Sequence, residues 1–144
     1  MFHIILYKQF MCEVVIPDEE IDRETFKNLV ENATTNIAFK FTANWCGPCQ
    51  KSKEYFNSRV ELFNKENPNP NIKTYLYILD VDEHFDIYAL LKSKKMTKGI
   101  PCYMLYALKG KDERPNYYTS DVFVSGSEND NINLFFDYIK KSLT

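Results

Sequence analysis

The stretch Ile37-Ala38-Phe39-Lys40-Phe41-Thr42-Ala43-Asn44-Trp45-Cys46-Gly47-Pro48-Cys49 decides the fold of this chain. Its first part, Ile37–Phe41, is flanked by polar residues and is too short for a helix, which predicts a buried central strand. The residues after Cys49 show apolar side chains at helical spacing, namely Phe56, Val60 and Phe63. A strand therefore delivers Cys46 at its end, and a helix follows from Cys49.

The segments on either side of this stretch continue the alternation of strands and helices. We expect further strands at Glu13–Ile16, Lys73–Val81, Cys102–Leu108 and Thr119–Val124, and helices at Arg23–Asn32, Glu83–Lys95 and near Ile132–Leu143, with loops at Asn67–Asn71 and Lys109–Tyr117. Ser127 or Asn129 is expected to cap the last helix. This order predicts a single α/β domain over residues 1–144, with a central mixed sheet of about five strands flanked by about four helices. Residues 1–12 would be an N-terminal extension or an extra strand.

Composition and charge point to a soluble, cytoplasmic protein. The 144 residues carry 18 basic and 20 acidic side chains, so a net charge of −2 offers no field that would attract nucleic acid or an anionic membrane. We find no secretory signal at the start and no apolar run of the ~18 residues that a spanning helix needs. Four cysteines are few for a secreted disulfide scaffold and suit a reducing compartment.

The spacing of Cys46 and Cys49 predicts a reactive dithiol. A free cysteine thiol has a pKa of about 8.5 and is only ~3% ionised at pH 7. Because the thiolate is the form that attacks a disulfide, a reactive cysteine needs a lower pKa. If Cys46 lies at a helix N-terminus, the unsatisfied N–H groups and the helix dipole favour its thiolate. Cys49 then lies within one turn and can attack the mixed disulfide formed at Cys46. Pro48 suits the first turn of a helix.

A zinc site is the main alternative for a Cys-x-x-Cys pair. It would need further ligands, and the candidates Cys12, Cys102, His3 and His84 contain no second close pair. We therefore expect no metal and no cofactor other than the redox-active Cys46–Cys49 disulfide. His3 and His84 have no companions that would make them ligands or bases.

The segment Phe41–Cys49 resembles the active-site segment of the thioredoxin family, with its Trp-Cys-Gly-Pro-Cys core. Asp80-Val81-Asp82 and Gly99-Ile100-Pro101 match the next landmarks of that family in order and spacing, and the resemblance covers about residues 13–143. It implies a thioredoxin fold in which Pro101 is a cis-proline facing the cysteines and the backbone of Ile100 binds an extended peptide. The implied apolar rim consists of Trp45, Gly47, Pro48, Ile100, Ser125 and Gly126.

The resemblance implies a disulfide reductase that acts on disulfide-containing proteins and is recycled by a thioredoxin-reductase-type electron donor. Two other functions stay open. A disulfide oxidase or isomerase would use the same cysteines, although Gly47-Pro48 favours the reductase. A thioredoxin-fold binding module with weakened catalysis would explain the unusual residue at position 40.

The clearest departure from the family is Lys40, which stands where the family has a buried acid that assists the resolving cysteine. Its ammonium could extend outward to solvent over a buried stem or lie near Cys49 as a cation, and we favour the first because burying an unpaired ammonium is costly. In either case resolution would be slower or would use another base, such as Asp80 or water. On this interpretation, Lys40→Asp speeds dithiol turnover.

Two further features allow more than one interpretation. Cys102, directly after Pro101, could be a third redox partner, but we favour a small buried residue, as for Cys12. The polar segment Lys109–Tyr117 could touch a partner, but we favour a solvated insertion.

Overall fold

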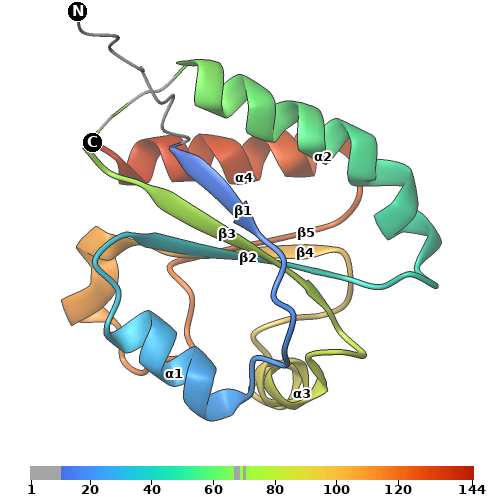
Figure 1. Ribbon diagram of the computed structural model, residues 1–144, viewed down its shortest axis with the longest axis horizontal. Coiled ribbons are helices and arrows are strands. Elements are labelled where there is room, and N and C mark those ends of the chain that lie inside the picture. Colours follow the sequence, from blue (N-terminus) through green and yellow to red (C-terminus); the bar gives the residue numbers. More distant parts are fainter. Residues whose placement is uncertain (1–10, 67–68, 70) are drawn as a thin grey trace, which may run out of the picture.

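The computed structural model describes residues 11–66, 69 and 71–144 (Figure 1). The elements are β1 (Cys12–Val15), α1 (Arg23–Glu31), β2 (Asn36–Thr42), α2 (Gly47–Glu66), β3 (Thr74–Asp80), α3 (Phe85–Ser93), β4 (Cys102–Tyr106), the 3-10 helix η1 (Leu108–Glu113), β5 (Val122–Ser125) and α4 (Asn129–Ser142). The predicted order of strands and α-helices is confirmed. The predicted extension covers residues 1–12, of which Cys12 is the first residue of β1. Residues 1–10, including His3, and residues 67, 68 and 70 of the predicted loop lie outside the described residues.

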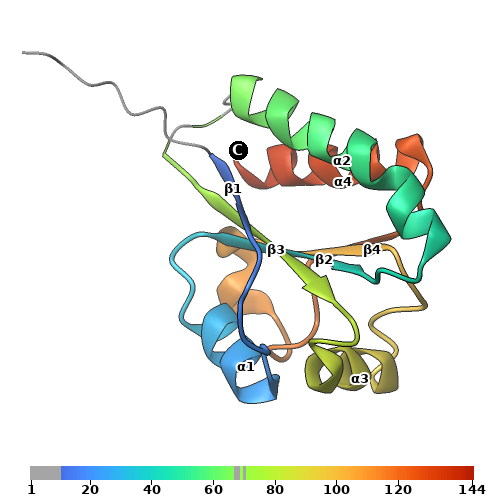
Figure 2. The ribbon, with the colours of Figure 1, turned by 45° about the vertical axis from the view of Figure 1, so that its right-hand side comes forward.

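The strands form one mixed sheet in the order β1-β3-β2-β4-β5. β1, β3 and β2 run parallel, whereas β4 is antiparallel to β2 and to β5. Helices α2 and α4 cover one face of the sheet, and α1 and α3 cover the other (Figures 1 and 2). The predicted mixed sheet with helices on both faces is therefore confirmed.

The central strand β2 is buried on both faces, as its short apolar run predicts. Because side chains alternate along a strand, Ile37, Phe39 and Phe41 pack into the core beneath α1 and α3. Ala38 packs into the core beneath α2 and α4. Lys40 shares the face of Ala38, so its side chain points toward α2 rather than toward open solvent.

The last helix begins at a residue that the sequence interpretation did not select. Glu128 is the N-cap of α4, with extended backbone angles (φ −68°, ψ 148°) and no side-chain capping hydrogen bond. Asn129 is already the first helical residue, and Ser127 lies one position before the cap. The prediction of Ser127 or Asn129 as the cap was therefore wrong, because helix geometry rather than the preferred capping side chain sets this boundary.

The predicted solvated insertion between β4 and β5 is more ordered than a polar loop. It contains η1 and is held by Arg114, which donates from Nη2 to the Ala107 carbonyl at 2.7 Å and to Asp121 Oδ2 at 3.0 Å. Asp121 in turn accepts from the Ala107 amide at 2.7 Å. These bonds fasten the segment at the end of β4 farthest from Pro101.

Candidate functional site

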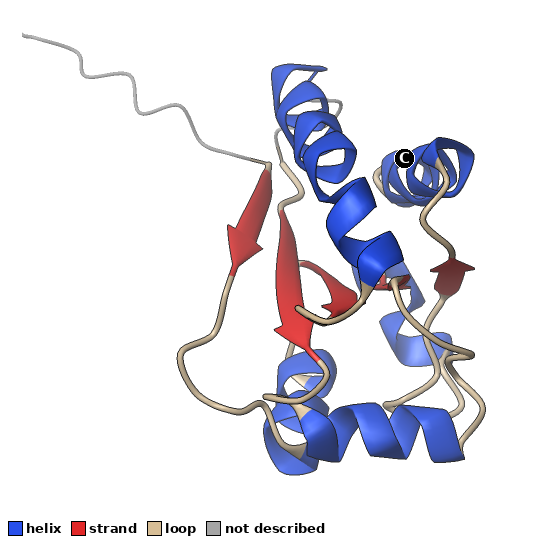
Figure 3. Cartoon of the chain, turned by 90° about the vertical axis from the view of Figure 1, so that its right-hand side faces the viewer, coloured by secondary structure: helices blue, strands red, loops and turns tan. Residues whose placement is uncertain are grey.

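The site lies at one edge of the sheet because strand direction places four loops there. The parallel strands β2 and β3 both end at this edge, and the antiparallel strand β4 begins there, with Phe41 paired to Cys102. β5 ends at the same edge, since Ser125 pairs with Cys102. The segments after β2, before β4 and after β5, which the sequence analysis singled out, therefore come together (Figure 3).

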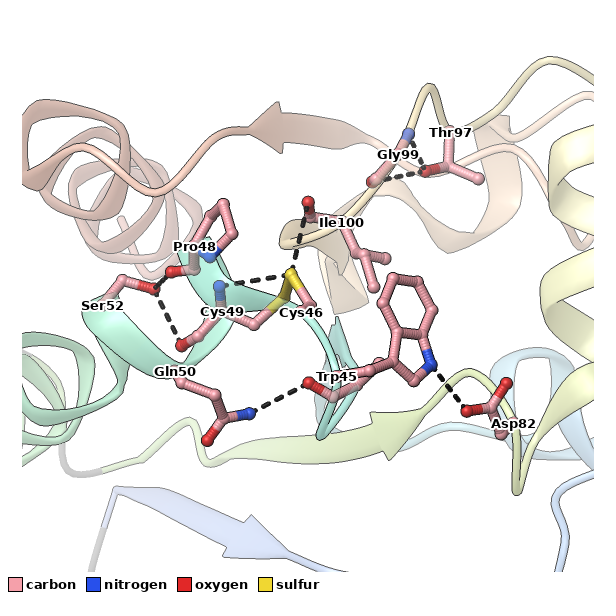
Figure 4. Close-up of a disulfide and its surroundings, with 11 residues drawn as sticks. Trp45, Cys46, Pro48, Cys49, Gln50, Ser52, Asp82, Thr97, Gly99 and Ile100 are labelled. Carbon is pink, nitrogen blue, oxygen red and sulfur yellow. Dashed lines mark hydrogen bonds between the residues drawn. A yellow bond between two sulfur atoms is a disulfide. The ribbon is translucent and has the colours of Figure 1, made fainter.

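Cys46 and Cys49 form a disulfide with Cα atoms 5.2 Å apart at the start of α2. The backbone N–H of Cys49 donates to Cys46 Sγ at 3.2 Å (Figure 4). This is the contact expected where a helix N-terminus offers an N–H group to a sulfur anion. Helical hydrogen bonding begins at Gln50, whose N–H donates to the Cys46 carbonyl at 3.1 Å. Gly47 and Pro48 are exposed beside the pair.

Trp45 stands out from this edge with 68% of its surface exposed. Its indole Nε1 donates to Asp82 Oδ2 at 2.8 Å, which joins the loop after β2 to the loop after β3 (Figure 4). Asp82 was quoted only as part of a motif in the sequence analysis, which assigned it no role at the site. The adjacency of β2 and β3 is the signal that could have found it.

The peptide bond between Ile100 and Pro101 is cis, as the family resemblance implied. Cys46 Sγ lies 3.9 Å from the Ile100 carbonyl oxygen, so this segment faces the pair. The N–H of Gly126 donates to the Pro101 carbonyl at 3.1 Å and thereby ties the loop after β5 to it. Gly126 has a φ of +119°, and a Cβ there would lie 2.5 Å from Asn131 Nδ2, so a larger residue would strain the backbone and displace the Asn131 side chain.

Lys40 and Cys49 line the same cavity, and the lysine side chain does not extend outward. The residue is only 3% exposed, and with Cys49 it lines a cavity of about 300 Å³ between the sheet and α2. Burial and, to a smaller extent, the nearby Lys53 ammonium lower the pKa of Lys40 to about 8. The expectation of an outward ammonium was wrong. Helices cover both faces of the central strand, so the Lys40 side chain packs between the sheet and α2.

Asp80, the alternative base, also lines this cavity. Its Oδ1 accepts from the backbone N–H groups of Asp82 at 2.8 Å and Glu83 at 3.3 Å. The carboxylate therefore supports the turn that carries Asp82 as well as facing the cavity.

Cys102 and Cys12 are free and buried. Cys102 Sγ contacts Thr97 Oγ1 at 3.2 Å, and burial raises the pKa of its thiol to about 11. Burial raises the pKa of Cys12 to about 12. Both groups are therefore thiols at neutral pH, which fits the interpretation of small buried residues.

His84 has a structural contact that the sequence did not indicate. It is buried, and its Nδ1 accepts the N–H of Ile21 at 2.9 Å, which fastens the segment before α1 to the start of α3. Burial lowers the pKa of this imidazole. Among residues 11–66, 69 and 71–144, no three His, Cys, Asp or Glu side chains gather into a potential metal site. Nor does any helix of this part reach the length and apolarity of a membrane span.

Comparison with known proteins assigns this arrangement to a class. The thioredoxin family model matches residues 18–120, so the chain belongs to the thioredoxin family. Thioredoxin 3 of Plasmodium falciparum is 33% identical over 81 residues, which cover 55% of this chain and 38% of the relative. The match thus spans well under half the length of that relative.

Solved structures agree with the fold assignment. A thioredoxin from Plasmodium falciparum superposes with a TM-score of 0.55 at 15% identity, over 88% of this chain and 97% of the other. A thioredoxin from Trypanosoma brucei brucei gives 0.56 at 19% identity, over 92% and 95%. The family and the cysteine pair together define the class: a member of the thioredoxin family with a Cys46–Cys49 disulfide at the start of α2.

Proposed function

We propose that this protein reduces disulfide bonds in other proteins by dithiol exchange, with Cys46 as the nucleophile and Cys49 as the resolving residue. The observation that carries the proposal is the hydrogen bond from the Cys49 N–H to Cys46 Sγ at 3.2 Å. Such a donor stabilises a thiolate at Cys46 and not at Cys49.

The reaction has two exchange steps. The Cys46 thiolate attacks one sulfur of the substrate disulfide, forms a mixed disulfide and releases the other substrate sulfur as a thiolate. The Cys49 thiolate then attacks Cys46 Sγ, so that the Cys46–Cys49 disulfide forms and the second substrate sulfur leaves. Two electrons pass to the substrate, and a dithiol donor must return them to the cysteine pair.

An incoming peptide would lie in extended form against Ile100 and Pro101. The backbone of Ile100 would pair with it as in an added strand, and Trp45, Gly47, Pro48, Ser125 and Gly126 would form the apolar rim. Trp45 supports this proposal through its exposure and its fixed position on Asp82.

The partners and location follow from the same proposal. We expect disulfide-containing proteins as substrates, a thioredoxin-reductase-type donor, no cofactor beyond the cysteine pair, and no nucleic-acid or membrane partner. A reducing, cytoplasmic compartment suits a chain whose other cysteines are buried thiols.

The test combines trapping with a redox titration. Cys49→Ser should hold substrates on Cys46 as mixed disulfides that dithiothreitol releases, and the unaltered protein should catalyse insulin reduction. A strongly reducing potential for the pair supports a reductase, whereas an oxidising potential would identify an oxidase or isomerase. A Cys49→Ser protein that traps nothing would favour a binding module.

A further inference from the structure

Lys40 holds an unusual position for a cation. Its Nζ lies 4.1 Å from the centroid of the Phe56 ring, and the residue is 3% exposed. None of the salt bridges or hydrogen bonds found in the described part of the chain includes its ammonium. The face of the Phe56 ring is therefore the main group that stabilises the charge. Cys49 and Phe56 are buried positions of α2 seven residues apart, so they lie along one side of the helix. Lys40 and Cys49 both line the cavity of about 300 Å³.

The charged groups around this cavity come from several elements. Lys53 of α2, Asp80 at the end of β3 and Glu83 in the following turn also line it. These three carry a formal charge of −1, which Lys40 brings to zero, and of the four charged residues Lys40 alone is buried. On β4, Tyr103 pairs in register with Lys40, and burial raises the pKa of its phenol to about 12, which keeps it neutral. β1 and the residue that follows it contribute only the apolar Val14 and Ile16.

Lys40 is mainly an ammonium at pH 7 in spite of its burial. Desolvation and the Lys53 charge bring its pKa down to about 8, which still leaves most of the population protonated one unit lower. A buried cation that shares a cavity with a buried thiol favours the thiolate, because solvent and salt screen the attraction less than at the surface.

We propose that Lys40 is a positioning residue for the resolving step: its ammonium stabilises the Cys49 thiolate across the cavity that the two residues share. The inference rests on the proposed function of the cysteine pair. It reverses the expectation drawn from the sequence, in which replacing Lys40 by an acid speeds turnover.

The step balances without an additional reactant. In the mixed disulfide, the Cys49 thiol loses its proton to water and its thiolate attacks Cys46 Sγ. The Cys46–Cys49 bond forms, the bond from Cys46 to the substrate sulfur breaks, and that sulfur leaves with the electron pair and takes a proton from water. Lys40 neither gains nor loses a bond.

The two steps can be followed separately with the aromatic disulfide DTNB. The first equivalent of coloured thiolate reports attack by Cys46, and the second reports displacement by Cys49 from the mixed disulfide. In stopped-flow measurements across a pH series, Lys40→Met should leave the first release unchanged. It should slow the second roughly tenfold at pH 7 and raise its pH midpoint by about one unit.

Further variants separate charge from shape. Lys40→Arg should restore part of the second rate because the positive charge is kept, and Lys40→Asp should be slower than Lys40→Met. Lys65→Met, an exposed position at the far end of α2, is the matched control and should match the unaltered protein.

The proposal is overturned if Lys40→Met keeps the rate and midpoint of the second release, or if Lys40→Asp speeds it. Failure of the unaltered protein to release the first equivalent would instead refute the proposed function of Cys46, and this inference with it. The two failures are therefore distinguishable in a single experiment.

Discussion

Cys46 and Cys49 are three positions apart in the sequence, yet different kinds of groups surround their sulfur atoms. Cys46 meets backbone groups: the N–H of Cys49, the carbonyl of Ile100 and the exposed loops around them. Cys49 is 1% exposed and faces a cavity lined by side chains, including Lys40. Backbone positions follow from the fold, whereas a side-chain environment changes with single substitutions. The fold therefore supplies the attacking site, and individual residues tune the resolving site.

The largest effect should come from removing the attacking group itself. Cys46→Ser should lower insulin reduction by at least about a thousandfold, because a hydroxyl is not ionised at neutral pH and the free thiols Cys12 and Cys102 are buried away from substrate. Initial rates with dithiothreitol as donor measure it. Cys12→Ala, which removes a buried thiol away from the site, is the control. Substantial activity in Cys46→Ser would assign the attack to another cysteine and remove the distinction drawn between the two sites.

The next effect concerns stability and the cost of the buried ammonium. Because the pKa of Lys40 is lowered to about 8 in the folded protein, folding disfavours the protonated side chain at neutral pH. Lys40→Met should therefore raise the free energy of unfolding at pH 7 by about 3 kcal/mol. Urea denaturation at several pH values measures the difference.

The sign of the pH dependence follows from the direction of the shift. The penalty in the unaltered protein is complete below pH 8 and fades as pH rises from about 8 to about 10.5, where the unfolded lysine also becomes neutral. The advantage of Lys40→Met should shrink over that window, whereas exposed Lys65→Met should show none at any pH. If the gain is absent or constant with pH, burial does not penalise the Lys40 ammonium. The surroundings of Cys49 would then not differ from those of Cys46 in holding a buried charge.

The strand and helix pattern was predictable because each element has a clear period. The run Ile37–Phe41 and the spacing of Phe56, Val60 and Phe63 predicted β2 and α2, and these elements place Cys46 at a helix start. The cap of α4 was missed because the Glu128 side chain makes no capping hydrogen bond, so no capping residue marks the boundary in the sequence.

The side-chain contacts of the site were harder to predict because they join distant segments. Trp45 and Asp82 meet only because β2 and β3 are neighbours, and nothing in either local pattern indicates the bond. Lys40 was placed wrongly because the cost of burying a charge was weighed without knowing that α2 covers that face of the central strand. The cavity that receives the ammonium is a property of packing and has no sequence signature.

A smaller effect on activity is expected from removing the exposed indole of Trp45, next to Cys46. Trp45→Ala should raise KM for a protein substrate so that kcat/KM falls roughly tenfold with kcat little changed, since the ring offers apolar surface to the docked peptide. Steady-state insulin reduction measures both constants. Tyr138→Ala, which removes an exposed aromatic residue from α4, should alter neither. A fall in kcat with unchanged KM would place Trp45 in the exchange step and not in docking.

The smallest effect should come from loosening the indole without removing it. Asp82→Ala deletes the acceptor that lies 2.8 Å from Trp45 Nε1, and an exposed hydrogen bond of this kind contributes about 1 kcal/mol or less. We expect kcat/KM to fall by roughly two- to threefold, and the emission of the chain's single tryptophan to change. Asp82→Asn keeps an acceptor oxygen and loses the charge, so it should behave more like the unaltered protein. If Asp82→Asn and Asp82→Ala are equally slow, the charge of Asp82 matters and the orientation of the Trp45 ring does not. The surroundings of Cys46 would then also depend on side-chain electrostatics.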